Sequence, residues 1–181
     1  DYNGDRILNS RWLNAPIITH QVVGDRLGSY DKRYPQSLLD SLMRRNPVLG
    51  RELTNNPVIH AAITFSDLMT LHAGAHALTL LSVPGPTPGN IWVSWPEAGI
   101  LFAGDSVVSG FHPPLSEMCL QDWLASIERL IAEYLDAALI VPGRGEPGSS
   151  RIVAPLQAYL QRLASLAQDT IAAGGSRQEL I

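Results

Sequence analysis

The residues best suited to chemistry in this chain are carboxylates that stand near arginines in short polar motifs. The chain opens with Asp1-Tyr2-Asn3-Gly4-Asp5-Arg6, in which three acidic or amide side chains alternate with other residues. Asp105 follows the apolar segment 100–103, and Arg144 lies in the motif Pro142-Gly143-Arg144-Gly145. Carboxylate and amide oxygens bind cations, whereas a guanidinium group only donates hydrogen bonds. These motifs therefore suit either a metal site or a cluster of ion pairs.

Composition excludes several classes of function. The 181 residues carry a net charge of −4 and contain no run of basic residues, which disfavours nucleic acid or an anionic membrane as a partner. The single cysteine, Cys119, excludes an internal disulfide. Apolar runs are far shorter than the roughly 20 residues of a membrane helix. We expect a soluble, cytoplasmic protein.

The hydrophobic pattern predicts one mixed α+β domain over residues 1–181. Period-two alternation or short apolar runs predict strands, and apolar residues at i, i+3, i+4 and i+7 predict helices. Pro47 and Gly50 are interpreted as breaks, and Gly74 as the turn of a hairpin. The predicted strands are 17–20, 59–65, 68–71, 77–83, 91–95, 100–103 and 137–141, and the predicted helices are 6–14, 35–45, 121–134 and 151–173.

Three motifs, taken together, resemble those of the metallo-β-lactamase-fold superfamily. They are Pro84-Gly85-Pro86-Thr87-Pro88-Gly89-Asn90, Phe102-Ala103-Gly104-Asp105 and Val141-Pro142-Gly143-Arg144-Gly145. They are similar in order and spacing to the family's PGHTPGS, LFAGD and VPGHG, and Asp1 to Arg6 stands where the family has HxHxDH. The resemblance implies a four-layer αββα sandwich, and zinc as the usual metal of such proteins.

The resemblance also implies which positions correspond to metal ligands. Ligand histidines of the family correspond to Asp1, Asn3, Arg6, Pro86 and Arg144, whereas the family's two ligand aspartates are kept as Asp5 and Asp105. Proline offers no ligand atom, and arginine cannot bind zinc. We therefore expect a vacated site without metal or other cofactor.

Arginine at two former ligand positions suggests what replaces the metal. Asp5 and Asp105 would repel each other without a cation, and Arg6 and Arg144 stand where they can neutralise both through forked hydrogen bonds. This reading predicts an internal ion-pair cluster.

Other metal or catalytic sites remain alternatives. His72 and His76 would share a face if they lay on a helix, but Gly74 favours a hairpin there. Asp1, Asn3 and Asp105 offer oxygen ligands for a weakly bound cation. His112 follows the Asp105 segment closely enough to line a pocket, and Ser106 lacks a histidine at a spacing typical of an activated nucleophile.

The resemblance further implies that the family's initial β-rich segment is missing from residues 1–181. An open sheet edge and an apolar face would then need cover. We expect a companion N-terminal fragment or subunit, or strand exchange in a homo-oligomer. The other explanation is that residues 1–181 are part of a longer polypeptide.

The leading functional hypothesis is a degenerate, metal-free domain with a binding, regulatory or structural role, in effect a pseudoenzyme. The alternative is a hydrolase of thioester, lactone or glutathione-thioester type that uses a remodelled site. No substrate can be named from the sequence, because a fold carries many functions.

Overall fold

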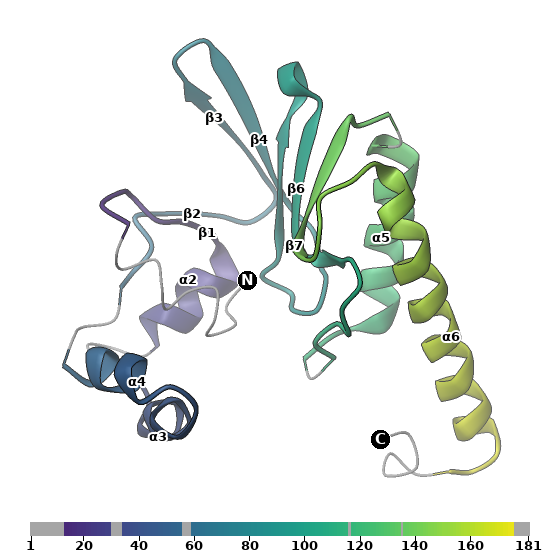
Figure 1. Ribbon diagram of the computed structural model, residues 1–181, viewed down its shortest axis with the longest axis horizontal. Helices are drawn as coiled ribbons and strands as arrows, with labels where there is room; N and C mark the ends of the chain where they lie inside the picture. The colour runs from purple at the N-terminus through teal and green to yellow at the C-terminus, as the bar shows by residue number, and fades with distance from the viewer. Residues whose placement is uncertain (1–12, 30–33, 56–58, 116, 135, 176–181) are drawn as a thin grey trace. The chain divides into compact units, whose positions relative to one another are not determined.

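The computed structural model describes residues 13–29, 34–55, 59–115, 117–134 and 136–175 (Figure 1). The chain divides into two compact units, Asp1–Asp67 and Leu68–Ile181. No helix among these described residues is long and apolar enough to cross a membrane.

The described residues of the first unit form three α-helices and a pair of parallel strands. The helices are α2 (Gln21–Gly28), α3 (Gln36–Arg45) and α4 (Pro47–Thr54), and β1 (Ile18–His20) pairs with β2 (Ile63–Phe65). Its core is formed by apolar side chains from the helices and the segment before α3, namely Val23, Leu27, Tyr34, Leu39 and Leu53. The predicted helix at 35–45 is confirmed, and the strand predicted at 59–65 is confirmed for its last three residues.

Of the two residues interpreted as breaks, Pro47 does mark one, because α3 ends at Arg45 and α4 begins at Pro47, whereas Gly50 does not. Pro47 is the first residue of α4, where its missing N–H costs nothing, and Asn46 caps the helix by accepting from Leu49 N at 3.2 Å. Gly50 lies inside α4, where a Cβ atom would come within 2.6 Å of Met43 Sδ. Glycine is therefore required by the close packing of α3 against α4 rather than by a turn.

His20 has a structural role between β1 and α2. Its Nδ1 accepts from Val22 N at 3.2 Å and so caps α2, while its Nε2 lies 3.0 Å from the Ser66 carbonyl oxygen. Because a carbonyl only accepts, Nε2 carries the proton in this arrangement.

The helix predicted over 6–14 lies mostly outside the described residues, and Leu13 and Asn14 are not helical.

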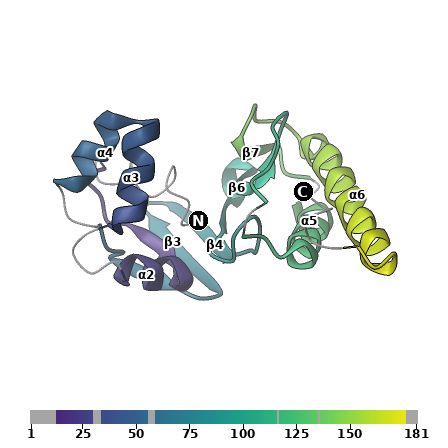
Figure 2. The ribbon, with the colours of Figure 1, turned by 90° about the horizontal axis from the view of Figure 1, so that it is seen from below.

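The second unit is a five-stranded sheet with two helices on one face (Figures 1 and 2). The strand order is β3-β4-β5-β6-β7, antiparallel except for the parallel pair β6–β7. The strands are β3 (Leu68–Ala73), β4 (His76–Ser82), β5 (Ile91–Trp95), β6 (Ile100–Val108) and β7 (Leu139–Arg144). All five were predicted, and β3–β4 turns at Gly74 (φ 64°) as expected.

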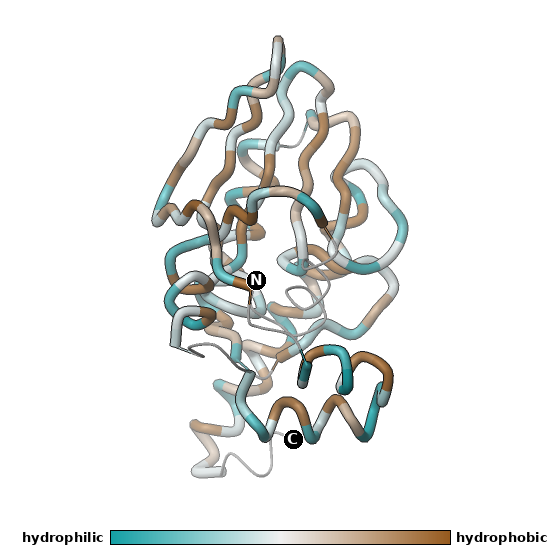
Figure 3. The backbone as a smooth tube through the Cα atoms, turned by 90° about the vertical axis from the view of Figure 1, so that its left-hand side faces the viewer, coloured by the Kyte–Doolittle hydropathy of each residue, from teal (hydrophilic) through white to brown (hydrophobic). Residues whose placement is uncertain are grey.

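The helices of this unit are α5 (Leu120–Tyr134) and α6 (Val153–Ala172), close to their predicted bounds. α5 presents Trp123, Ile127 and Leu130 to the sheet, where all three are fully buried. Hydrophobic and hydrophilic residues interchange along the backbone (Figure 3). The main core lies between these helices and the sheet, and Trp92 and Leu101 are among its fully buried members on the strands.

Candidate functional site

Three of the motifs identified in the sequence meet within the second unit. The 83–90 loop joins β4 to β5, and a Cβ atom added to Gly85 would lie 3.1 Å from Ser106 Cβ. On β7, a Cβ atom added to Gly143 would come within 2.6 Å of the Gly104 carbonyl carbon. The loop, the segment around Asp105 and the end of β7 are therefore packed against one another.

A distortion in β6 places Asp105. The pairing of β6 with β7 shifts register on both sides of Gly104, whose φ of 54° is unfavourable for other residues. Asp105 is only 1% exposed. A Cβ at Gly143 would overlap Asp105 Oδ1, so the two glycines hold the carboxylate in a confined space.

Arg144 forms an ion pair with this carboxylate. Its Nε lies 3.9 Å from Asp105 Oδ1, and the Arg144 side chain is 38% exposed whereas that of Asp105 is 0% exposed. The Arg144 carbonyl accepts from Ser109 N at 2.9 Å, which fixes the end of β7 to the segment that follows β6. The distance is one of charge pairing, longer than a direct hydrogen bond.

Ser106, the residue that follows Asp105, is held in place by hydrogen bonds from two tryptophans. Its hydroxyl accepts from Trp92 Nε1 at 2.6 Å and donates to the Ala103 carbonyl at 2.7 Å. Its own carbonyl accepts from Trp123 Nε1 at 2.9 Å. Ser106 is fully buried, and its hydroxyl is committed to these contacts, which is a structural role. The sequence feature that could have indicated this structural role is the pair of core tryptophans, because a buried indole N–H needs an acceptor.

The described donor set does not fit zinc. Pro86 is buried in its loop and has no lone pair to offer, and Arg144 has only donors. Asp105 remains as an oxygen ligand, whereas zinc sites need three or four nitrogen, sulfur or oxygen ligands. In the part of the chain that the structure describes, no group of three histidine, cysteine, aspartate or glutamate side chains is placed to hold a metal ion.

Asp1, Asn3, Asp5 and Arg6 lie outside the described residues. The expected cluster of two carboxylates and two arginines therefore stays a prediction for Asp5 and Arg6. The oxygen-ligated cation site expected at Asp1, Asn3 and Asp105 stays a prediction for the same reason.

His112 lines a cavity of about 240 Å³ beside the end of β6. Its Nδ1 lies 2.9 Å from the Pro113 carbonyl oxygen, and its Nε2 lies 2.8 Å from the Tyr159 hydroxyl. Because the carbonyl only accepts, Nδ1 carries the proton, and neutral His112 accepts from Tyr159 through Nε2. The rings of His112 and Tyr159 meet edge to face at 5.5 Å between centroids. Tyr159, on α6, was not identified from the sequence as a partner of His112.

The pair His72 and His76 does not form a metal site in the β3–β4 hairpin. His72 is paired with Ala77, and His76 with Ala73. Cross-strand partners share a face and successive residues alternate, so the two imidazoles project from opposite faces of the sheet.

Comparison with known proteins agrees with this architecture. The family model of the metallo-beta-lactamase superfamily matches residues 11–174. The hydroxyacylglutathione hydrolase of Bartonella henselae is 29% identical over 123 residues, which is 67% of this chain and 48% of that protein. The chain thus spans about half the length of this relative.

Solved structures show the same fold. A metallo-beta-lactamase from Pontibacter korlensis superposes with a TM-score of 0.62 at 20% identity, covering 88% of this chain and 66% of that one. The DIM-1 metallo-beta-lactamase superposes with a TM-score of 0.60 at 20% identity, covering 89% of this chain and 66% of that one. The order of the motifs, the α+β architecture and the family match together show that this chain belongs to the metallo-beta-lactamase superfamily.

Proposed function

We propose that this protein is a degenerate, metal-free member of its superfamily, with a binding, regulatory or structural role. The observation that supports this most directly is Arg144 Nε at 3.9 Å from the buried Asp105 Oδ1. A buried carboxylate is costly unless a cation balances it. Arg144 supplies the positive charge that a metal ion would otherwise bring.

Pro86 supports the same proposal from the neighbouring loop. It is buried, so the position is filled by a packed ring rather than by an open ligand. Arg144 and Pro86 together remove two of the ligand positions that the family resemblance implies around Asp105. A water nucleophile activated by zinc needs a bound metal with an open coordination position, which this donor set does not provide.

The rival function is hydrolysis of a thioester at a remodelled site. Its support is the similarity to a protein named hydroxyacylglutathione hydrolase, of which this chain spans 48%. A remodelled hydrolase would need a general base that reaches solvent and substrate. His112 is the described residue that best meets this need, since it is exposed and lines a cavity.

A hydrolysis assay separates the two proposals. Purified protein is incubated with a hydroxyacyl-glutathione thioester, with and without added zinc, and free thiol is measured. If the protein is a metal-free binding domain, the thioester hydrolyses at its uncatalysed rate in both conditions. Turnover that is lost in His112→Ala and retained in the matched surface variant His60→Ala would instead establish the remodelled hydrolase.

A further inference from the structure

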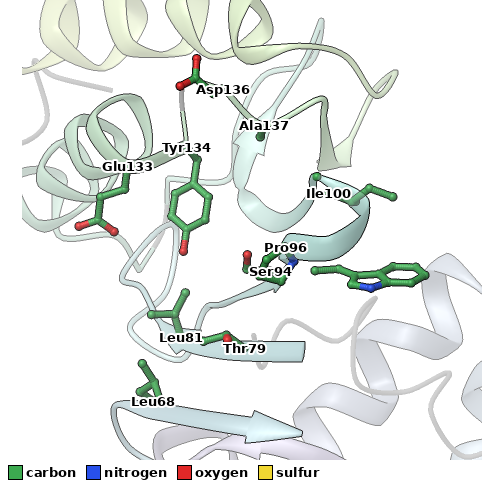
Figure 4. A pocket seen from close by; sticks show the side chains of 12 residues that line it. Leu68, Thr79, Leu81, Ser94, Pro96, Ile100, Glu133, Tyr134, Asp136 and Ala137 are labelled. Carbon is green, nitrogen blue, oxygen red and sulfur yellow. The ribbon is translucent and has the colours of Figure 1, made fainter. Parts of the chain in front are cut away.

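A second cavity, of about 520 Å³, lies in the same unit but away from Asp105 (Figure 4). Strands β3, β4 and β5 contribute Leu68, Thr79, Leu81 and Ser94 to it. The end of α5 and the turn after it contribute Glu133, Tyr134, Asp136 and Ala137. This volume falls in the range of cavities that bind small molecules, which is about 300–1,000 Å³.

The cavity is separate from the ion-paired site. It reaches Ile100 at the beginning of β6, whereas Asp105 comes five residues later on the same strand. At about 3.3 Å per strand residue, the two lie about 16 Å apart along the strand. A ligand in the cavity would therefore not touch Asp105 or Arg144.

Three hydroxyl groups gather on one side of the cavity. Thr79 and Ser94 are directly paired between β4 and β5, so their side chains emerge next to each other from the same face of the sheet. The Tyr134 hydroxyl forms a hydrogen bond with the Ser94 side chain. In Figure 4 the Tyr134 ring extends from α5 towards the strands, with its hydroxyl directed at them. Each hydroxyl offers acceptor lone pairs as well as a donor.

Aliphatic side chains form the remaining surface of the cavity. Leu68 and Leu81 line it from β3 and β4, while Pro96 and Ile100 border it after the end of β5 and at the beginning of β6. Such a surface suits the apolar body of a ligand, while the hydroxyl groups fix a polar end.

The charge around the cavity is negative. Glu133 and Asp136 stand at its rim, and the described lining residues include no lysine, arginine or histidine. Arg129 lies nearby on α5, but both Glu133 carboxylate oxygens accept from its Nε at 3.0 Å. The Arg129 charge is therefore balanced by Glu133, and the Asp136 charge takes no part in that pair.

The end of α5 adds to this field. The carboxyl end of a helix carries partial negative charge, which basic residues in the last turn commonly offset. The last turn of α5 contains no basic residue. The Asp136 carboxylate and the end of the helix therefore act in the same direction, and both favour a cationic ligand.

We propose that this cavity binds a small organic amine with an apolar body. The protonated amino group donates to the hydroxyl oxygens of Thr79, Ser94 and Tyr134 and is attracted by Asp136 and by the carboxyl end of α5. The apolar body packs against Leu68 and Leu81. This binding site stands independently of the function proposed for the Asp105 region.

Three probes of nearly equal size and different charge test the proposal. 2-Phenylethylamine, 2-phenylethanol and 3-phenylpropionate are titrated separately into isotopically labelled full-length protein, and binding is followed by amide chemical shifts. We expect the amine to bind about tenfold more tightly than the alcohol, and the carboxylate to bind most weakly. Perturbed signals should map to the cavity residues, and the preference for the amine should shrink at high ionic strength.

Paired variants separate charge from shape. Asp136→Asn should weaken binding of the amine about twofold to fivefold and leave binding of the alcohol unchanged, since exposed charges contribute modestly. Glu146→Gln, an exposed charge change on the segment after β7, should change neither. Tyr134→Phe, which keeps the ring, should weaken both the amine and the alcohol. Equal affinity for the three probes, shifts that map elsewhere, or the absence of saturable binding would overturn the proposal.

Discussion

Arg144 Nε lies 3.9 Å from Asp105 Oδ1, and the carboxylate of this pair is fully buried while the guanidinium group is partly open to solvent. The sequence places these residues 39 positions apart on β6 and β7, and a distorted strand brings them together at Gly104. The pair therefore depends on the backbone of two parallel strands as much as on charge. Removing either charge should therefore lower the stability of the whole unit.

Arg144→Gln should destabilise the protein by about 2 kcal/mol, because it leaves the buried Asp105 carboxylate without this cation. We place the loss below the range for a fully buried pair since Arg144 is 38% exposed. Urea unfolding measures it. Arg129→Gln is the matched control, because the Arg129–Glu133 pair is exposed on both sides and should contribute about 0.5 kcal/mol. Equal losses in the two variants would contradict a special role for Arg144.

Gly143→Ala should destabilise the protein by about 2 kcal/mol or more, because the new methyl group overlaps Asp105 Oδ1 and approaches Asp105 N within 2.6 Å. The same unfolding measurement applies. Gly28→Ala is the control, since no atom lies within 4 Å of a Cβ at Gly28, and it should cause no loss. A neutral effect of Gly143→Ala would show that the carboxylate is not confined.

Tyr134 should titrate above the ordinary range of a tyrosine in alkaline solution. Burial, followed by the nearby Glu133 charge, raises its pKa above the ordinary 10.0. The folded state thus holds the phenol proton more tightly than the unfolded state. This contribution to stability is complete below pH 10 and is lost as the pH rises through the higher folded-state pKa. Ultraviolet titration of the wild type and Tyr134→Phe should identify the late-titrating group, and its persistence in the variant would refute the assignment.

His20 and His112 should occupy opposite neutral tautomers. His20 accepts at Nδ1 and donates from Nε2 to Ser66 O, whereas His112 donates from Nδ1 to Pro113 O and accepts at Nε2. Nitrogen chemical shifts of the imidazoles in mildly alkaline solution, where histidine is neutral, report the protonated nitrogen directly. Tyr159→Phe should leave the Nδ1 proton of His112 in place. The same tautomer at both residues would show that one of these networks is incorrect.

Strong periodic signals explain what the sequence could predict of the fold. Trp123, Ile127 and Leu130 recur at helical spacing and define α5, and Gly74 marks the β3–β4 turn. α2 was not predicted, because Gly24 and Gly28 weaken the helical signal in a segment of eight residues. α4 was missed because Pro47 and Gly50 have helical roles, N1 and close packing, that depend on neighbours in space.

The site was predictable as a set of positions, and its geometry was not. Asp105 and Arg144 stand out in their motifs, but their 3.9 Å separation follows from the register shift at Gly104. The hydrogen bond between Tyr159 and His112 joins residues 47 positions apart, and no local spacing reports such a contact. The hydroxyl row of Thr79, Ser94 and Tyr134 likewise depends on strand pairing and on the docking of α5.

The metal content of the purified protein tests the central claim most directly. Protein prepared without chelators in zinc-supplemented medium is analysed by elemental mass spectrometry, beside the variant Pro86→His/Arg144→His, which adds two imidazoles near Asp105. A site balanced by Arg144 should carry less than about 0.1 zinc, iron or manganese per chain, with more zinc in the variant. About one tightly held metal ion per wild-type chain would contradict the metal-free site.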